Sequence, residues 1–157
     1  MTLKACLASI VATLALSSPA AACTLCSCSA SASGVSFGSY DPSGSSPTDA
    51  SGTVTLSCTG VVSLLGTIDI AASPGTSGDL TARQMAQGAN RLNYNLYTDS
   101  SRTSILGTGA NGTGTISAPL NGLLVFNQSV TVYGRLPARQ WVKSGAYADS
   151  VVVTITY

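Results

Sequence analysis

The sequence ends on the stretch Val151-Val152-Val153-Thr154-Ile155-Thr156-Tyr157. Large apolar side chains occupy every second position of this stretch, and two threonines lie between them near its end. A period of two is that of a β-strand with one buried face. The stretch therefore predicts a final, strongly hydrophobic strand.

Shorter runs of the same kind precede it, separated by Gly, Pro, Ser and Asn, and no window carries a helical stripe of useful length. Thr53 to Cys58 alternates most clearly and turns Cys58 inward. The other predicted strands are Val35 to Tyr40, Leu65 to Ala71, Leu92 to Tyr97 and the region of Val130 and Val132. The predicted fold class is all-β.

An immunoglobulin-type sandwich uses about seven strands to cover both inner faces, and this pattern predicts one fewer. The last strand is followed by no turn, so its edge would stay open and prone to aggregation. Another polypeptide could supply the missing strand by β-augmentation. Alternatively, the weaker segment Ile116 to Ala118 supplies it, and the pattern does not choose between the two.

Residues 1–22 have the features of a secretory signal peptide: Lys4, an apolar run from Ala5 to Leu16, and small residues before Cys23. The run has about a dozen residues, whereas a membrane-spanning helix needs about 20. A lipoprotein signal would carry a large aliphatic residue where this sequence has Ala20. We therefore predict a signal peptide over 1–22 and a single exported domain over 23–157.

Charged residues make up 8% of the chain, with seven basic and six acidic side chains and no histidine. This balance is not that of a polyanion binder, and it argues against nucleic acid as a partner. A hydrolase would need an Asp pair, or a Ser with Lys143 as its base, and Ser144 lies in no nucleophile motif. The composition predicts a protein that is not an enzyme, with no cofactor and no metal.

Four cysteines follow the predicted signal peptide, and an even number in an exported chain implies disulfides. Three pairings are open; the most economical joins Cys28 to Cys58 and leaves Cys23 to close on Cys26. A redox or zinc site at Cys23 and Cys26 is the alternative. It lacks the strand-to-helix setting of redox motifs and a histidine to complete a ligand set.

Several short motifs occur in an order and spacing that resemble a known family. They are Cys28, Phe37-Gly38-Ser39-Tyr40, Gly52, Cys58, Arg83-Gln84-Met85, Leu92-Asn93-Tyr94-Asn95-Leu96-Tyr97-Thr98-Asp99, Gly107, Tyr133-Gly134-Arg135-Leu136-Pro137, Gln140, Gly145-Ala146-Tyr147-Ala148-Asp149 and the terminal run. Together they resemble the spore coat protein U domain family, which includes subunits of archaic chaperone-usher pili of the Csu type. The resemblance covers nearly the whole of residues 23–157.

The resemblance implies an incomplete immunoglobulin-like β-sandwich whose missing last strand is provided by donor-strand complementation. It also implies passage through the periplasm with a pilus chaperone, then assembly at an outer-membrane usher into a surface fibre of subunits joined by strand addition. It favours the Cys28 to Cys58 disulfide.

Particular residues receive expected roles within this picture. Val151, Val153 and Ile155 would line the groove that the donor strand fills, with Tyr157 at its rim. Asp149 would pair with Arg83 or Arg135.

The aromatic residues divide into two groups. Phe37, Tyr94 and Tyr147 are expected in the core rather than on a sugar-binding platform. Trp141 lies between Pro137 and Gly145 and is the candidate for an exposed adhesive residue.

A polymerising pilin carries an N-terminal extension with alternating large apolar residues, whereas residues 23–28 contain only Leu25. The expectation is a subunit that accepts a donor strand without donating one, at the tip of a fibre. The alternative is a self-contained secreted coat protein of a spore or cell surface.

Overall fold

The computed structural model describes residues 8–15, 26–60, 64–122 and 125–156. These residues form ten strands and one short 3-10 helix, η1 (Gly75–Ser77). The strands are β1 (Ala8–Ala15), β2 (Cys26–Ala32), β3 (Ser36–Gly38), β4 (Thr48–Gly60), β5 (Leu64–Ala72), β6 (Arg83–Gln87), β7 (Asn90–Tyr97), β8 (Ile116–Gly122), β9 (Val125–Leu136) and β10 (Tyr147–Thr156). No helix in these ranges has the length and apolarity needed to cross a membrane.

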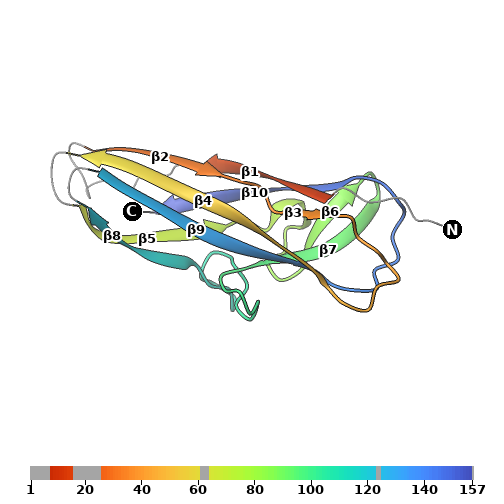
Figure 1. The fold of residues 1–157 in the computed structure, drawn as a ribbon. Coiled ribbons are helices and arrows are strands. Elements are labelled where there is room, and N and C mark those ends of the chain that lie inside the picture. The colour runs from red at the N-terminus through yellow and green to blue at the C-terminus, as the bar shows by residue number, and fades with distance from the viewer. Residues whose placement is uncertain (1–7, 16–25, 61–63, 123–124, 157) are drawn as a thin grey trace.

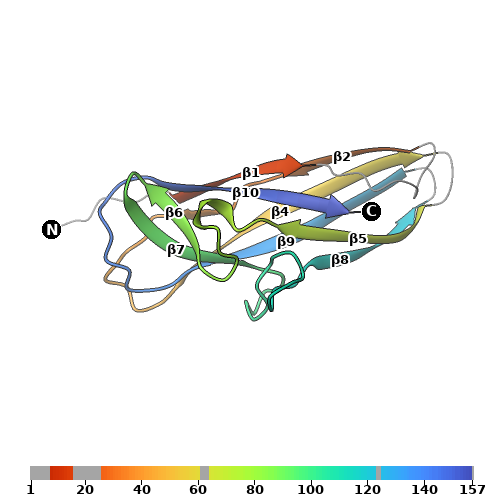
Figure 2. The ribbon, with the colours of Figure 1, turned by 180° about the vertical axis from the view of Figure 1, so that it is seen from behind.

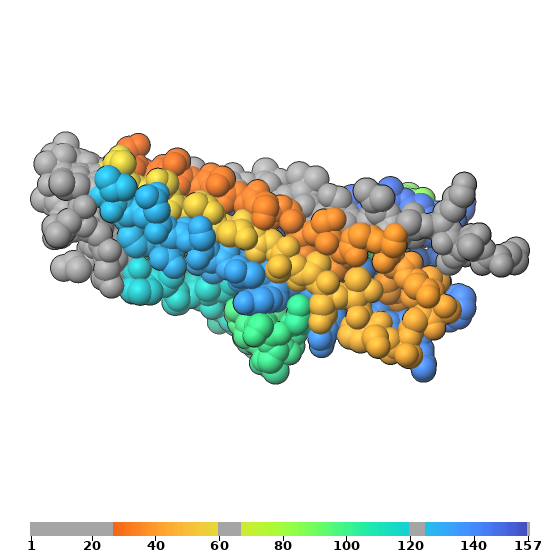
Figure 3. Space-filling model, in the orientation of Figure 1, coloured from red at the N-terminus to blue at the C-terminus, as the bar shows by residue number. Residues whose placement is uncertain are grey.

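The strands form an elongated sandwich of two layers (Figure 1). In one layer β4 pairs with β2 on one side and with β9 on the other, and β9 continues to β7. The facing layer contains β3, β1 and β10, with β5 and β8 beyond β10. β7 also pairs with β6, which links the two layers at one end. Figure 3 shows β2, β4, β9 and β8 side by side along one face.

The all-β prediction is confirmed, and each predicted strand has a counterpart. Within residues 23–157 two strands, β2 and β6, were not predicted, and β1 was not predicted because its residues were assigned to the signal peptide. β2 alternates serine with Cys28, Ala30 and Ala32, small residues that pack partly buried against the core. β6 carries an arginine at a core position. Because β2 precedes it, the predicted strand from Val35 to Tyr40 is not the first of the domain, and only residues 36–38 of it are strand.

The inward faces of the two layers form one apolar core. Val54, Leu56 and Cys58 of β4 are all buried, as the alternation of that run predicted. Phe37 contacts Tyr94 edge to face, with ring centroids 6.1 Å apart. The prediction that Phe37, Tyr94 and Tyr147 are core aromatics is confirmed, because all three are buried.

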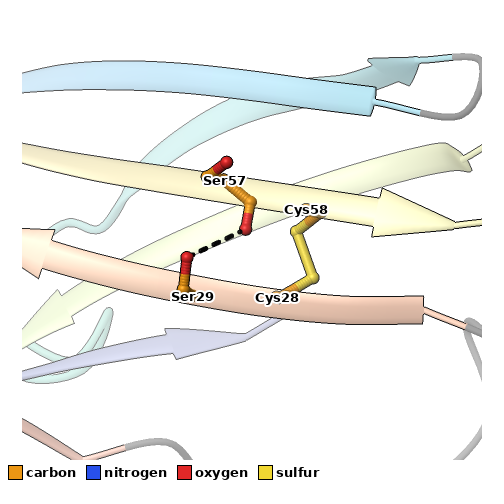
Figure 4. The surroundings of a disulfide bond; sticks show 4 residues. All are labelled: Cys28, Ser29, Ser57 and Cys58. Atoms are coloured by element: carbon orange, nitrogen blue, oxygen red, sulfur yellow. Dashed lines mark hydrogen bonds between the residues drawn. A yellow bond between two sulfur atoms is a disulfide. The ribbon is translucent and has the colours of Figure 1, made fainter.

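A disulfide joins Cys28 of β2 to Cys58 of β4, as the resemblance favoured. The two cysteines are directly opposite each other in the antiparallel ladder, beside a hydrogen bond from Ser29 Oγ to the Ser57 carbonyl (Figure 4). Cys58 is fully buried, so the link anchors the outer strand β2 to the core. The predicted Cys23 to Cys26 link lies outside the described residues.

Gly134 of β9 lies directly beneath β3. A β-carbon at this position would come within 2.7 Å of Val35 Cγ1 and 2.8 Å of Phe37 Cζ. We expect Gly134→Ala to lower the free energy of unfolding by about 1 to 3 kcal/mol through overpacking, measured by urea denaturation.

The control for this prediction is a double-mutant cycle. Val35→Ala alone should destabilise the domain, but combined with Gly134→Ala it should cost less than the sum of the two single changes. Strict additivity would mean that the contact with Val35 is not the source of the loss.

Candidate functional site

The last strand, β10, is paired along both of its edges. One edge contacts β6 at Ala148 and β5 over residues 153–156. The other edge pairs with β1 over residues 147–154, from Ala8 opposite Tyr147 to Ala15 opposite Thr154 (Figure 2). β10 is therefore an inner strand only while β1 is present.

β1 fills a position between β10 and β3. Its other edge pairs with β3 through Ala8 opposite Gly38 and Ser9 opposite Ser36. β1 is parallel to β10, whereas the other strand pairs within the described ranges are antiparallel. Without β1, both β10 and β3 would present open edges facing each other.

All of β1 comes from the predicted signal peptide. The apolar run was interpreted only as a targeting segment, although its β-branched residues Ile10, Val11 and Thr13 favour a strand. The structure gives the same residues a place in the sheet. The boundary between signal peptide and domain stays a prediction.

The segment Ile116 to Ala118, the alternative source of the missing strand, begins β8. β8 pairs with β5, on the far side of β5 from β10. It therefore does not occupy the position between β10 and β3.

The predicted groove residues lie together on the inner side of β10. Val151, Val153 and Ile155 are buried, and they alternate with less buried residues along the strand. Tyr157 lies outside the described residues. The three described side chains form the apolar row next to the strand position.

A buried carboxylate fixes the beginning of β10. Asp149 accepts hydrogen bonds from Tyr94 Oη at 2.7 Å, Thr76 Oγ1 at 2.8 Å and Thr76 N at 3.0 Å. Burial, together with the bond to Asp149, raises the pKa of Tyr94 far above its ordinary value. The phenol therefore stays protonated and remains a donor to Asp149.

Arg83 is fully buried beside this group. Its guanidinium donates to the carbonyls of Ser73, Leu80 and Leu106 at 2.8 to 3.1 Å and to Asn95 Oδ1 at 2.7 Å. Burial lowers the pKa of Arg83. Through these hydrogen bonds the Arg83 side chain holds the loop before β6 and the loop after β7 against the core.

The expected ion pair of Asp149 with Arg83 or Arg135 is wrong. Arg83 is committed to backbone carbonyls and Asn95, and Arg135 bonds both oxygens of Asp49 at 2.7 and 2.9 Å. Arg135 and Asp49 are directly opposite each other on β9 and β4. Arg102 joins the same carboxylate at 3.3 Å, and these partners lower the pKa of Asp49.

Trp141 lies in the loop between β9 and β10, far from the apolar row, with 78% of its surface exposed. Across the described ranges, no three Cys or Asp side chains gather as a metal ion would require. The distinctive feature of the site is the position between β10 and β3 that β1 fills, called the strand position below.

Comparisons with known proteins agree with this architecture. The model of the Spore Coat Protein U domain family matches residues 11–154. Protein U of Myxococcus xanthus is 36% identical in an alignment 143 residues long that covers 84% of this chain and 77% of that protein.

A solved structure shares the fold. It is the CsuC–CsuE chaperone–tip adhesion subunit pre-assembly complex from the archaic chaperone-usher Csu pili of Acinetobacter baumannii, with a TM-score of 0.56 and 22% identity over 85% of this chain. The present chain spans 40% of the length of that solved chain. At this identity the likeness is one of fold.

The fold and the strand position define an immunoglobulin-like β-sandwich with a place for a further strand beside its last one. The chain belongs to the Spore Coat Protein U domain family, whose model covers most of its length.

Proposed function

We propose that the protein is a structural or adhesive subunit of a bacterial surface fibre assembled by a chaperone-usher pathway. One observation carries the proposal: the position between β10 and β3 is filled by residues 8–15, which the predicted signal peptidase cleavage removes. The exported domain would then need a strand from another chain.

Without β1, the exported domain would have an open edge along β10. Removing β1 exposes backbone hydrogen-bonding groups of β10 along residues 147–154 and uncovers the side of the row formed by Val151, Val153 and Ile155. Unpaired backbone groups and an apolar sheet edge favour aggregation. In the periplasm a pilus chaperone would supply the strand, and after passage through an outer-membrane usher a neighbouring subunit would replace it by β-strand addition.

Within the fibre we assign this subunit to the tip. Only residues 23–25 lie between the predicted cleavage site and β2, and β2 is held by its pairing with β4 and by the Cys28–Cys58 disulfide. With so short a segment before an anchored strand, such a subunit would receive a strand rather than donate one. A tip subunit meets surfaces first, and Trp141 is the candidate contact residue.

The second candidate is a self-contained secreted coat protein. The match to the Spore Coat Protein U domain family favours it. Both candidates are non-enzymatic and exported, and they differ in whether the domain needs a partner strand.

The test adds the strand back as a separate peptide. Domain 23–157, disulfides intact, is titrated with a peptide of residues 8–15 flanked by lysines, and its melting temperature is followed. We expect saturable stabilisation that grows with peptide concentration, reaching about 2.7 kcal/mol at 100 times the dissociation constant.

Matched peptides test the register. Position 14 pairs with Val153 and position 13 with Val152, and paired residues share a face of the sheet. Leu14→Asp in the peptide should abolish the stabilisation, whereas Thr13→Asp should be tolerated. If the domain melts cooperatively alone and no peptide alters it, donor-strand assembly is wrong and the coat protein is the better description.

A further inference from the structure

The net charge of the chain conceals an uneven distribution of its basic groups. Arg83 is buried, and Arg102 and Arg135 share Asp49. Arg91, Arg139 and Lys143 are exposed and make no ion pair with any residue that the structure describes. These three cations lie on β7 and on the loop between β9 and β10.

Those two segments meet at one end of the molecule. Gln140 of the loop bonds both backbone groups of Asn93, with Oε1 accepting from N and Nε2 donating to O, each at 2.8 Å. Asn93 is two residues from Arg91 on the exposed side of β7. Figures 1 and 2 show the loop and the β6–β7 hairpin at the same end.

The loop is held in place from beneath. Gln140 N donates to Tyr40 Oη at 2.8 Å, Val142 packs against the core, and Tyr147 Oη donates to the Lys143 carbonyl at 2.8 Å. Gln87 Nε2 reaches the carbonyl of Ser144 at 3.3 Å. These contacts fix the inward-facing residues of the loop, so its outward side chains are presented from an anchored backbone.

The outward side chains alternate with the anchored ones. Arg139, Trp141 and Lys143 are exposed, while Gln140 and Val142 are partly buried. Trp141 is therefore flanked in the sequence by two exposed cations, and Arg91 on β7 is a third. Asp41 follows Tyr40, which contacts this loop, and its carboxylate already accepts from Ser43 N and Ser43 Oγ.

We propose that Arg139, Trp141 and Lys143, supported by Arg91, form a binding surface for an acidic polysaccharide. The flat apolar face of the indole suits stacking on a pyranose ring, and the guanidinium and ammonium groups suit carboxylates carried by the same chain of sugars. This deepens the adhesive part of the proposed function by naming the ligand class. It requires only the folded domain, not fibre assembly.

The surface fits this ligand better than other polyanions. Membrane binding draws on a broad apolar face together with cations, and here a single indole is exposed; the other large exposed hydrophobic residue described, Val125, begins β9 at its opposite end. Nucleic acid binding relies on neutralising many phosphates, and three cations are few. One ring-sized aromatic between charges matches a charged sugar chain.

The test uses the full chain, 1–157, in which β1 completes the sheet, so its outcome is independent of donor-strand assembly. Trp141 is the only tryptophan in the chain, so its fluorescence reports directly on the site during titration with alginate, a polyuronate. We expect a saturable change, at least tenfold weaker binding by calorimetry for Trp141→Ala and for the double variant Arg139→Ala/Lys143→Ala, and loss of binding as salt is raised.

The controls decide among the alternatives. Val125→Ala should bind as the unchanged chain does, and dextran, a neutral polysaccharide, should not bind. Absence of alginate binding, equal binding by Trp141→Ala, or equal or tighter binding to single-stranded DNA or to vesicles containing anionic lipid would each overturn the proposal. Melting temperatures of all variants verify that the fold is retained.

Discussion

Replacing Arg83 by methionine in the full chain is expected to lower the free energy of unfolding by about 3 to 5 kcal/mol. Methionine fills similar space without donors, so the carbonyls of Ser73, Leu80 and Leu106 and the amide oxygen of Asn95 lose their shared partner. Asn95 Oδ1 keeps its bond from Leu96 N, but a buried acceptor left unsatisfied, such as the Leu106 carbonyl, costs about 1 to 3 kcal/mol. Such a loss is a large fraction of the roughly 5 to 15 kcal/mol that stabilises an ordinary domain. Urea denaturation followed by circular dichroism measures it.

Arg91→Met is the matched control. Arg91 lies on the neighbouring strand and is exposed, and among the described residues its guanidinium bonds only the Gly88 and Asn90 carbonyls. It should change stability by no more than about 0.5 kcal/mol. Arg83→Lys should remain destabilising, because an ammonium cannot span acceptors on several loops as the planar guanidinium does. Equal midpoints for Arg83→Met and Arg91→Met would show that the buried hydrogen bonds do not stabilise the fold.

Removing the disulfide is expected to have the second largest effect. The Cys28–Cys58 bond closes a loop with a sequence separation of 30 residues, and the chain-entropy relation gives about 3 to 4 kcal/mol for a loop of that length. The double variant Cys28→Ala/Cys58→Ala should therefore unfold at a markedly lower urea concentration than the oxidised chain.

The control is the adjacent pair on the same two strands. Ser29→Ala/Ser57→Ala removes an exposed hydrogen bond but no crosslink, and it should leave the midpoint nearly unchanged. If the cysteine variant also keeps its midpoint, the pairing of β2 with β4 is sufficient without the covalent link.

The strands that could be predicted from the sequence are those whose burial follows hydrophobicity. Thr53 to Cys58 and the final run alternate large apolar with polar residues. The first lies inside β4, and the described part of the second, residues 151–156, lies inside β10. β2 was not predicted because its inward residues are small. The alternation of Ser with Cys and Ala differs little in hydrophobicity from one position to the next. β6 escaped because Arg83 takes a core position through hydrogen bonds, which no hydropathy pattern reveals.

The candidate site was predictable in part. The expectation of a missing strand beside the last one followed from the strand count, and the structure has a strand position there. The occupant could not be predicted, because residues 8–15 had already been assigned to targeting. The ion pair of Asp149 failed for a related reason: partners across a sheet depend on register, and the register places Asp49 opposite Arg135.

The parallel run of β1 beside β10 has a consequence for symmetry. A tight turn after Thr156 would return antiparallel, so an occupant with the orientation of β1 must arrive from a distant part of the chain or from another molecule. The receiving position and the inserted segment are then different surfaces, and contacts of this kind are heterologous and generate open, directional arrays rather than closed two-fold dimers. Assemblies joined through this position would therefore have two chemically distinct ends, with growth and termination governed by different surfaces.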